Sequence, residues 1–179
     1  MELRDISMED LPLYERVLTD PDMMSELGGP LPKQGLSEKL RGIVESIDAG
    51  TVWFSVIVPD GVVGDGAGTV CIWDHDWNGE RISEIGWMVL PAFQGRGLAT
   101  AAVRSILRKA RSESRWDMIH AFPAVTNAPS NAICRKTGFS KIEECDFPLP
   151  GPDPSLQSLA TRPSLGRSRL KAGVQRFVE

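Results

Sequence analysis

Apolar residues along the chain switch between helical and strand spacing, and this pattern predicts the order of the secondary structure. Apolar side chains recur every three or four positions over residues 10–18 and 37–47, with Ser37 as a plausible cap for the second helix. The complete pattern predicts strands over 3–6, 52–58, 69–73, 81–90, 119–122 and 141–147, and helices over 10–18, 37–47, 98–111 and 129–136. We therefore expect a mixed α/β sheet with flanking helices.

Turn residues separate several of these elements. Asn78-Gly79 lies between two predicted strands, and both residues tolerate the positive φ angles of a tight hairpin. Gly138 follows the last predicted helix and is a typical helix end. These positions fix where the chain is expected to reverse.

The composition changes after Phe147. Residues 148–179 are rich in Pro, Gly and Ser and carry five Lys or Arg against two acids. We predict one domain over residues 1–147 and a loosely ordered basic extension over 148–179, with room for one terminal strand or helix near 170–178.

Overall composition limits the classes of function. The chain has 179 residues, of which 41% are hydrophobic and 25% charged, and its net charge is −4. An acidic chain without a concentrated basic surface is not expected to bind nucleic acid or acidic membranes. With no apolar signal core and no stretch of about 20 apolar residues, we expect a cytoplasmic protein. Its three cysteines are widely spaced, which argues against disulfides and structural zinc.

Asp74-His75-Asp76 is the nearest approach to a metal-binding cluster. Alternate residues of a strand point to opposite faces, so these three side chains would not converge on one ion. A polar turn is the favoured interpretation, and we expect no metal.

The segment from Gln94 to Thr100 indicates a phosphate site. Gly95 and Gly97 lack a Cβ and allow positive φ angles, so the backbone can approach a ligand closely. The first N–H groups of the following helix and its dipole attract anions, and Arg96 adds a full positive charge. A dinucleotide-binding or Walker loop is disfavoured, because neither the early G-x-G-x-x-G context nor the Walker lysine is present.

Two motifs in this region resemble those of the GNAT superfamily of N-acetyltransferases. Residues 94–99 (Gln-Gly-Arg-Gly-Leu-Ala) resemble its Q/R-x-x-G-x-G/A signature, preceded by the family's Val-x-Pro at 89–91. Residues 127–139 resemble its N-x-x-S/A-x-x-x-Y-x-K-x-G-F segment. The N-terminal residues 3–12 are similar to the Rim-type branch, which acetylates the N-termini of ribosomal proteins. The resemblance covers residues 1–147.

The resemblance implies the GNAT fold, in which two neighbouring strands of a mixed sheet splay apart and acetyl-CoA binds between them. It implies that the main chain of Met88 and Val89 pairs with the pantetheine and the thioester; the alternative is that both are ordinary core residues of the strand. Asn127 would bond the pantetheine amide, cap the short helix, or both. The implied cofactor-binding residues are Met88, Val89, Gln94, Gly95, Arg96, Gly97, Leu98, Ala99, Thr100 and Asn127.

The implied reaction is direct attack of an amine on the thioester in a ternary complex, and it needs a group that accepts a proton. Glu84 lies near the start of the strand before the turn, where several GNAT enzymes carry a general base. A strand-end acid or a structural hydrogen-bonding residue is an equally good interpretation of Glu84.

The leaving thiolate also takes up a proton, which a tyrosine commonly supplies in this family. This chain has Cys134 at that position, where a small buried cysteine is the commoner interpretation. Ser130, one helical turn earlier, or water is the alternative donor.

The acceptor is left open by the sequence. Trp73, His75 and Trp77, together with Asp74 and Asp76, either border an amine-binding cleft or cover a sheet edge. The row Arg104, Arg108 and Arg111 is expected to be a solvated helix face and not a phosphate clamp. We expect a monomer or homodimer that acetylates a primary amine of a small molecule or a protein N-terminus; a catalytically silent GNAT-fold module that binds acyl-CoA or a partner is the alternative.

Overall fold

The computed structural model describes residues 1–61, 66–148 and 169–178, and within them seven strands form one sheet in the order β1-β2-β3-β4-β5-β7-β6. These strands are β1 (Glu2–Asp5), β2 (Val52–Val58), β3 (Gly68–Trp77), β4 (Glu80–Val89), β5 (Met118–Ala121), β6 (Ser140–Pro148) and β7 (Arg169–Val178). Neighbouring strands are antiparallel except β4 and β5, which are parallel. The mixed α/β fold predicted from the sequence is confirmed.

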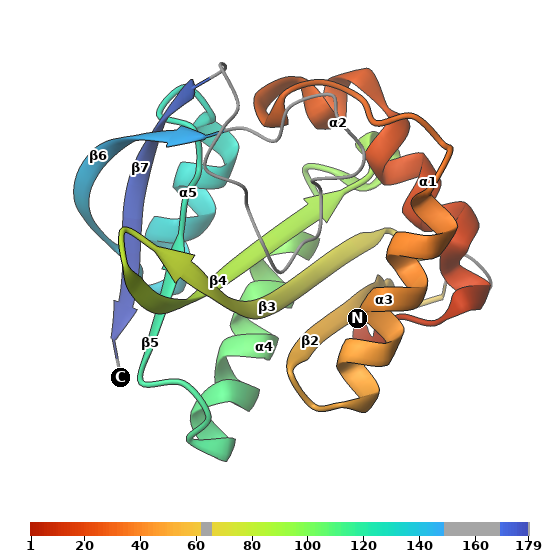
Figure 1. Cartoon of the computed structure of the whole chain (residues 1–179), viewed down its shortest axis with the longest axis horizontal. Coiled ribbons are helices and arrows are strands. Elements are labelled where there is room, and N and C mark those ends of the chain that lie inside the picture. The colour runs from red at the N-terminus through yellow and green to blue at the C-terminus, as the bar shows by residue number, and fades with distance from the viewer. Residues whose placement is uncertain (62–65, 149–168, 179) are drawn as a thin grey trace.

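Helices cover both faces of the sheet (Figure 1). One face carries α1 (Leu11–Thr19) and α3 (Leu36–Asp48), with the short α2 (Pro21–Met24) and the 3-10 turns η1 (Met8–Asp10) and η2 (Ser25–Leu27) in the same N-terminal region. The other face carries α4 (Leu98–Glu113), preceded by the 3-10 turn η3 (Pro91–Phe93), and α5 (Ala128–Thr137). The apolar stripes of α1, α3 and α4 account for this arrangement, because each stripe must be buried against the sheet. In the part of the chain that the structure describes, no helix is long and apolar enough to cross a membrane.

The N-terminal helices begin at positions that differ from the sequence prediction. Ser37 does not cap α3, because this helix begins one residue earlier, at Leu36, and its N-cap is Gly35 with φ of 86°. Pro21 is the first residue of α2, a position that proline tolerates well. The side chain of Asp20 caps α2 by accepting two main-chain hydrogen bonds.

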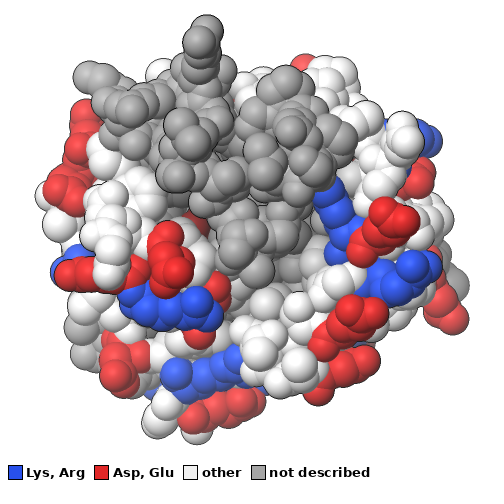
Figure 2. All heavy atoms as spheres, viewed as in Figure 1, with Lys and Arg blue, Asp and Glu red and all other residues white. Residues whose placement is uncertain are grey.

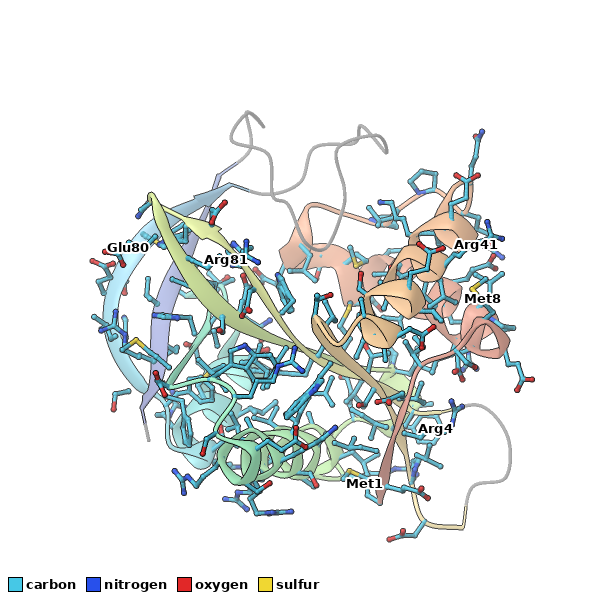
Figure 3. All side chains as sticks on the ribbon, turned by 60° about the horizontal axis from the view of Figure 1, so that its bottom comes forward. Met1, Arg4, Met8, Arg41, Glu80 and Arg81 are labelled. Carbon is cyan, nitrogen blue, oxygen red and sulfur yellow. The ribbon has the colours of Figure 1, made fainter. Side chains whose placement is uncertain are left out.

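The β3–β4 hairpin is longer than predicted. Residues 74–77 continue β3, so the polar turn expected at Asp74–Asp76 is wrong: the chain reverses only at Asn78 and Gly79, whose φ angles of 50° and 84° confirm the predicted tight turn. Glu80 and Arg81 mark the tip of this hairpin in Figure 3. The register of β3 against β4 runs without a shift from Trp77 and Glu80 to Gly68 and Val89.

The C-terminal part of the chain completes the sheet. The terminal strand or helix allowed by the sequence is a strand, β7, and it lies between β5 and β6, antiparallel to both. Part of the predicted extension therefore belongs to the same sheet as residues 1–147. The proposed domain boundary at residue 147 stays a prediction, and residues 149–168 lie outside the described part.

Candidate active site

Strands β4 and β5 separate at Glu84. Their parallel pairing consists of Ser83 with Ile119 and Glu84 with His120, after which β5 continues to Ala121 while β4 runs on to Val89. On its other edge, β5 pairs with β7 in antiparallel orientation. The two parallel strands thus form a V, with Glu84 and His120 at its vertex.

The turn between β4 and α4 is exposed and takes the conformation that its glycines allow. Gly95 and Gly97 have φ angles of 73° and 76°, and no heavy atom lies within 4 Å of a Cβ placed on either residue. Gly97 is the N-cap of α4 and makes no side-chain hydrogen bond, so the N–H groups of Leu98, Ala99 and Thr100 begin the helix without a side-chain cap. An uncapped end of a 16-residue helix favours an anionic ligand.

The turn is tied to the end of β4. The side-chain amide of Gln94 donates to the carbonyl of Val89 at 2.9 Å, and the Arg96 guanidinium lies 5.5 Å from the centre of the Phe93 ring. The Met88 carbonyl instead faces β3, since a Cβ on Gly68 would lie 2.0 Å from it. Of the two residues assigned to pantetheine, the structure thus places the Val89 carbonyl next to the turn and turns the Met88 carbonyl toward β3.

Glu84 lies on the face of the sheet that α1 and α3 cover. Alternation places Glu84, Gly86 and Met88 on one face of β4, and their β3 partners are Trp73, Cys71 and Thr69. The indole of Trp73 lies across Gly86, with ring atoms 3.3 Å from the position that a Cβ would occupy. The Glu84 carboxylate is 5% exposed, and its Oε2 is 2.8 Å from Nε2 of His75.

His120 is a residue of this site that the sequence analysis missed. It is the register partner of Glu84, and its side chain is buried. Its Nδ1 lies 3.3 Å from the carbonyl of Ser83, and its Nε2 accepts a hydrogen bond from Nε of Arg176 at 3.3 Å. Burial lowers the pKa of His120, and the nearby Arg176 charge adds to this effect. No local pattern marks this histidine, because only the pairing of β5 with β4 brings it to Glu84.

The residues of the predicted cleft at the β3–β4 hairpin divide between the two faces. Trp73 stacks on His75, with ring centroids 6.3 Å apart, on the Glu84 side. Asp74 faces the other side, where its Oδ1 accepts from Ser83 Oγ at 2.7 Å and from Trp116 Nε1 at 2.8 Å. Asp74 is therefore used within the fold and does not face the same side as His75.

Helix α5 holds the three residues of the second motif in different surroundings. Asn127 is the N-cap and accepts from the N–H of Ser130 at 3.0 Å, which confirms its capping role. Ser130 is half-buried in the first turn of the helix. Cys134 is fully buried in the core beneath α4, and burial raises the pKa of its thiol to about 12. Proton transfer from such a thiol to an ordinary thiolate, of pKa about 8.5, is uphill, so these observations weigh against Cys134 as the acid.

The arginine row of α4 is exposed. Arg104 donates to the carbonyl of Lys136 at 2.8 Å, and Arg108 lies on the same exposed face. Arg111 lies 5.6 Å from the centre of the Phe177 ring. The row therefore contacts α5 and β7 along a solvent-exposed face of the helix.

Comparisons with known proteins agree with this geometry. Residues 1–140 match the family model described as acetyltransferase (GNAT) domain. No curated protein matches the chain. Solved structures with the same fold include the ribosomal-protein-alanine N-acetyltransferase from Brucella melitensis (16% identity, 100% of both chains, TM-score 0.74) and the ribosomal-protein-S5-alanine acetyltransferase from Vibrio fischeri (16%, 98% of this chain and 91% of that chain, TM-score 0.73). An aminoglycoside acetyltransferase in complex with coenzyme A is also similar (16%, 98% and 93%, TM-score 0.70). At these identities the structural likeness shows the fold, and the family model supplies the assignment: the chain belongs to the GNAT acetyltransferase family.

Proposed function

We propose that the protein binds acetyl-CoA between β4 and β5 and transfers the acetyl group to a primary amine, with Glu84 as the base. The observation that carries this proposal is the position of a buried carboxylate at the vertex of the V whose other end is the exposed glycine turn. Five residue-to-residue steps along β4, each rising about 3.3 Å, lead from Glu84 to Val89. An extended pantetheine arm spans such a distance, so a diphosphate at residues 94–100 places the thioester toward Glu84.

The proton transfers of the proposed reaction balance. The acceptor enters as an ammonium ion and gives one proton to Glu84, which passes it on to solvent. The free amine attacks the thioester carbonyl, a C–N bond forms, and the C–S bond breaks as the tetrahedral intermediate collapses. The second N–H proton is lost, and the leaving thiolate gains one. The products are the amide, coenzyme A and one proton.

Ser130 is the proposed donor to the thiolate, with water as the alternative that the sequence analysis left open. Its hydroxyl is half-buried in the first turn of α5 beside Asn127, whereas the thiol of Cys134 is enclosed in the core. A thiolate is a good leaving group, so the donor needs to contribute less than the base does.

An acceptor with a single amine, such as a protein N-terminus, suits the charge distribution better than a polycation. Acidic and basic side chains are interspersed over the described part of the face in Figure 2, and Asp76 and Arg81 at the hairpin lie 3.9 Å apart. A polycation would gain most from a concentrated negative surface. Two of the similar structures are named as ribosomal-protein alanine acetyltransferases, which supports the same acceptor class.

The test is acetyl transfer to a panel of N-terminal peptides, polyamines, amino acids and aminoglycosides, followed by mass detection of the product and by release of the CoA thiol. We expect Glu84→Gln to lower kcat about 100-fold or more while calorimetry shows unchanged CoA binding. Glu80→Gln, an exposed change on the same strand, is the matched control. Tight CoA binding without transfer to any amine would instead identify a silent acyl-CoA-binding module.

A further inference from the structure

His75 and Glu84 form a buried pair on the α1 and α3 face of the sheet. His75 comes from β3 and Glu84 from β4, and their side chains are 2% and 5% exposed. Nε2 of His75 is 2.8 Å from Oε2 of Glu84, within ion-pair distance, and in the part of the chain that the structure describes this ring nitrogen makes no hydrogen bond. A histidine enclosed this completely beside the proposed base bears directly on how that base works.

The second ring nitrogen restricts the protonation of the pair. Nδ1 of His75 lies 3.2 Å from the main-chain carbonyl of Asp76, which can only accept. Nδ1 therefore carries a hydrogen. With Nδ1 protonated, a neutral ring presents a bare Nε2 to the carboxylate, and two lone pairs would face each other at 2.8 Å. One proton between Nε2 and Oε2 removes this repulsion, either as an imidazolium beside a carboxylate or as a carboxylic acid beside a neutral ring.

His120 cannot take this role, although it is the register partner of Glu84. Its Nε2 accepts from Arg176 and its Nδ1 lies within hydrogen-bonding distance of the Ser83 carbonyl, both at 3.3 Å. This arrangement uses both nitrogens of a neutral ring. On the strands beyond β4, His120 of β5 is the register partner of Glu84, and Arg176 of β7 is in turn the register partner of His120.

We propose that His75 positions Glu84 and shares a proton with it, so that the base of the reaction is a glutamate–histidine pair. This inference rests on the proposed function of Glu84. The pair takes up the proton that the acceptor ammonium loses and then releases it to solvent, and bond making and breaking at the thioester are unchanged. Trp73, which stacks on His75 and lies across Gly86, holds the imidazole in place.

Nitrogen NMR of the histidine rings tests the inference directly. The chain has only two histidines, so protein labelled with ¹⁵N-histidine gives two ring systems, which a His120→Gln variant assigns. We expect His75 to be protonated on Nδ1, with Nε2 shifted by the shared proton, and Glu84→Gln to convert Nε2 to that of a bare nitrogen. The His120 ring should not change. A His75 ring that is bare at Nδ1, or that is identical in wild type and Glu84→Gln, would overturn the proposal.

Kinetics separate this inference from the proposed function. We expect His75→Met to lower kcat about 100-fold with the KM for acetyl-CoA nearly unchanged, and His75→Gln, which keeps an N–H able to reach Glu84, to recover at least one tenth of the wild-type kcat. If Glu84→Gln loses activity and His75→Met does not, the pair is wrong and the function of Glu84 stands. If neither variant loses activity, the function of Glu84 fails as well. Should His75→Met not fold, the NMR comparison with Glu84→Gln still decides.

Discussion

The side-chain amide of Gln94 donates a 2.9 Å hydrogen bond to the carbonyl of Val89, and so ties the exposed turn before α4 to the last residue of β4. The two residues belong to the two parts of the proposed cofactor site: Gln94 to the anion-binding turn, and Val89 to the open strand. Their relative position is thereby set before any ligand binds.

Replacing Gln94 with Ala removes this tie. We expect the dissociation constant for CoA to rise about tenfold, equivalent to about 1.4 kcal/mol, while the melting temperature changes little because the side chain is exposed. Calorimetry with CoA measures the effect, and Gln34→Ala, in an exposed loop, is the control. Unchanged CoA affinity in Gln94→Ala would show that the hydrogen bond to Val89 does not contribute to CoA binding.

A glycine pair tests whether the turn holds the diphosphate. Gly97 and Gly50 have φ angles of 76° and 70°, and both have open space where a Cβ would lie. An alanine at either site should lower the free energy of unfolding by about 1–2 kcal/mol, which is the cost of holding one residue with a Cβ in the left-handed conformation. Only Gly97→Ala should weaken CoA binding, by about tenfold or more, because only its Cβ faces the proposed ligand. Equal CoA affinities of the two variants would contradict the proposed site.

The two candidate acids on α5 are separated by a second pair of variants. Cys134→Ala should leave kcat within about twofold of wild type and destabilise the fold by about 1 kcal/mol, because the thiol is buried in the core and its pKa is raised to about 12. Ser130→Ala should lower kcat about tenfold, less than the roughly 100-fold or more that is typical of a general acid, because a thiolate is a good leaving group. Steady-state kinetics and thermal unfolding measure both. A large loss of kcat in Cys134→Ala alone would restore the thiol as the donor.

The stability of the fold should fall on mild acidification because of His120. Burial lowers its pKa below the ordinary value of 6.5. As the pH falls below about 6.5, the unfolded chain takes up a proton that the folded chain does not, and the free energy of unfolding decreases until the folded pKa is reached. Above about pH 6.5 this contribution is constant.

Urea unfolding of wild type and His120→Gln at several pH values between about 5 and 7.5 measures this effect. The difference in unfolding free energy between the two proteins should change with pH only in the acidic part of the range. A difference that is independent of pH would mean that His120 titrates alike in the folded and unfolded chains.

Local patterns predicted most elements, and each failure has an identifiable physical cause. The strand at Val52–Val58 has the predicted bounds, and the helix that starts at Leu98 is two residues longer than expected. The cap at Ser37 failed because Gly35 adopts a left-handed conformation that starts the helix earlier. The tripeptide from Asp74 looked like a turn because it is polar, but Asp74 and His75 each find buried or half-buried partners on opposite faces of the sheet.

The sequence by itself determined the order of the elements, the positive-φ glycine turn before α4 and the family, because all three depend on residues close together in the chain. Only the tertiary structure decided that β7 enters between β5 and β6, that β4 and β5 part at Glu84, and that His75 contacts the Glu84 carboxylate while His120 lies opposite Glu84 on β5. Strand order and register depend on contacts between segments far apart in the sequence, and burial of side chains follows from those contacts.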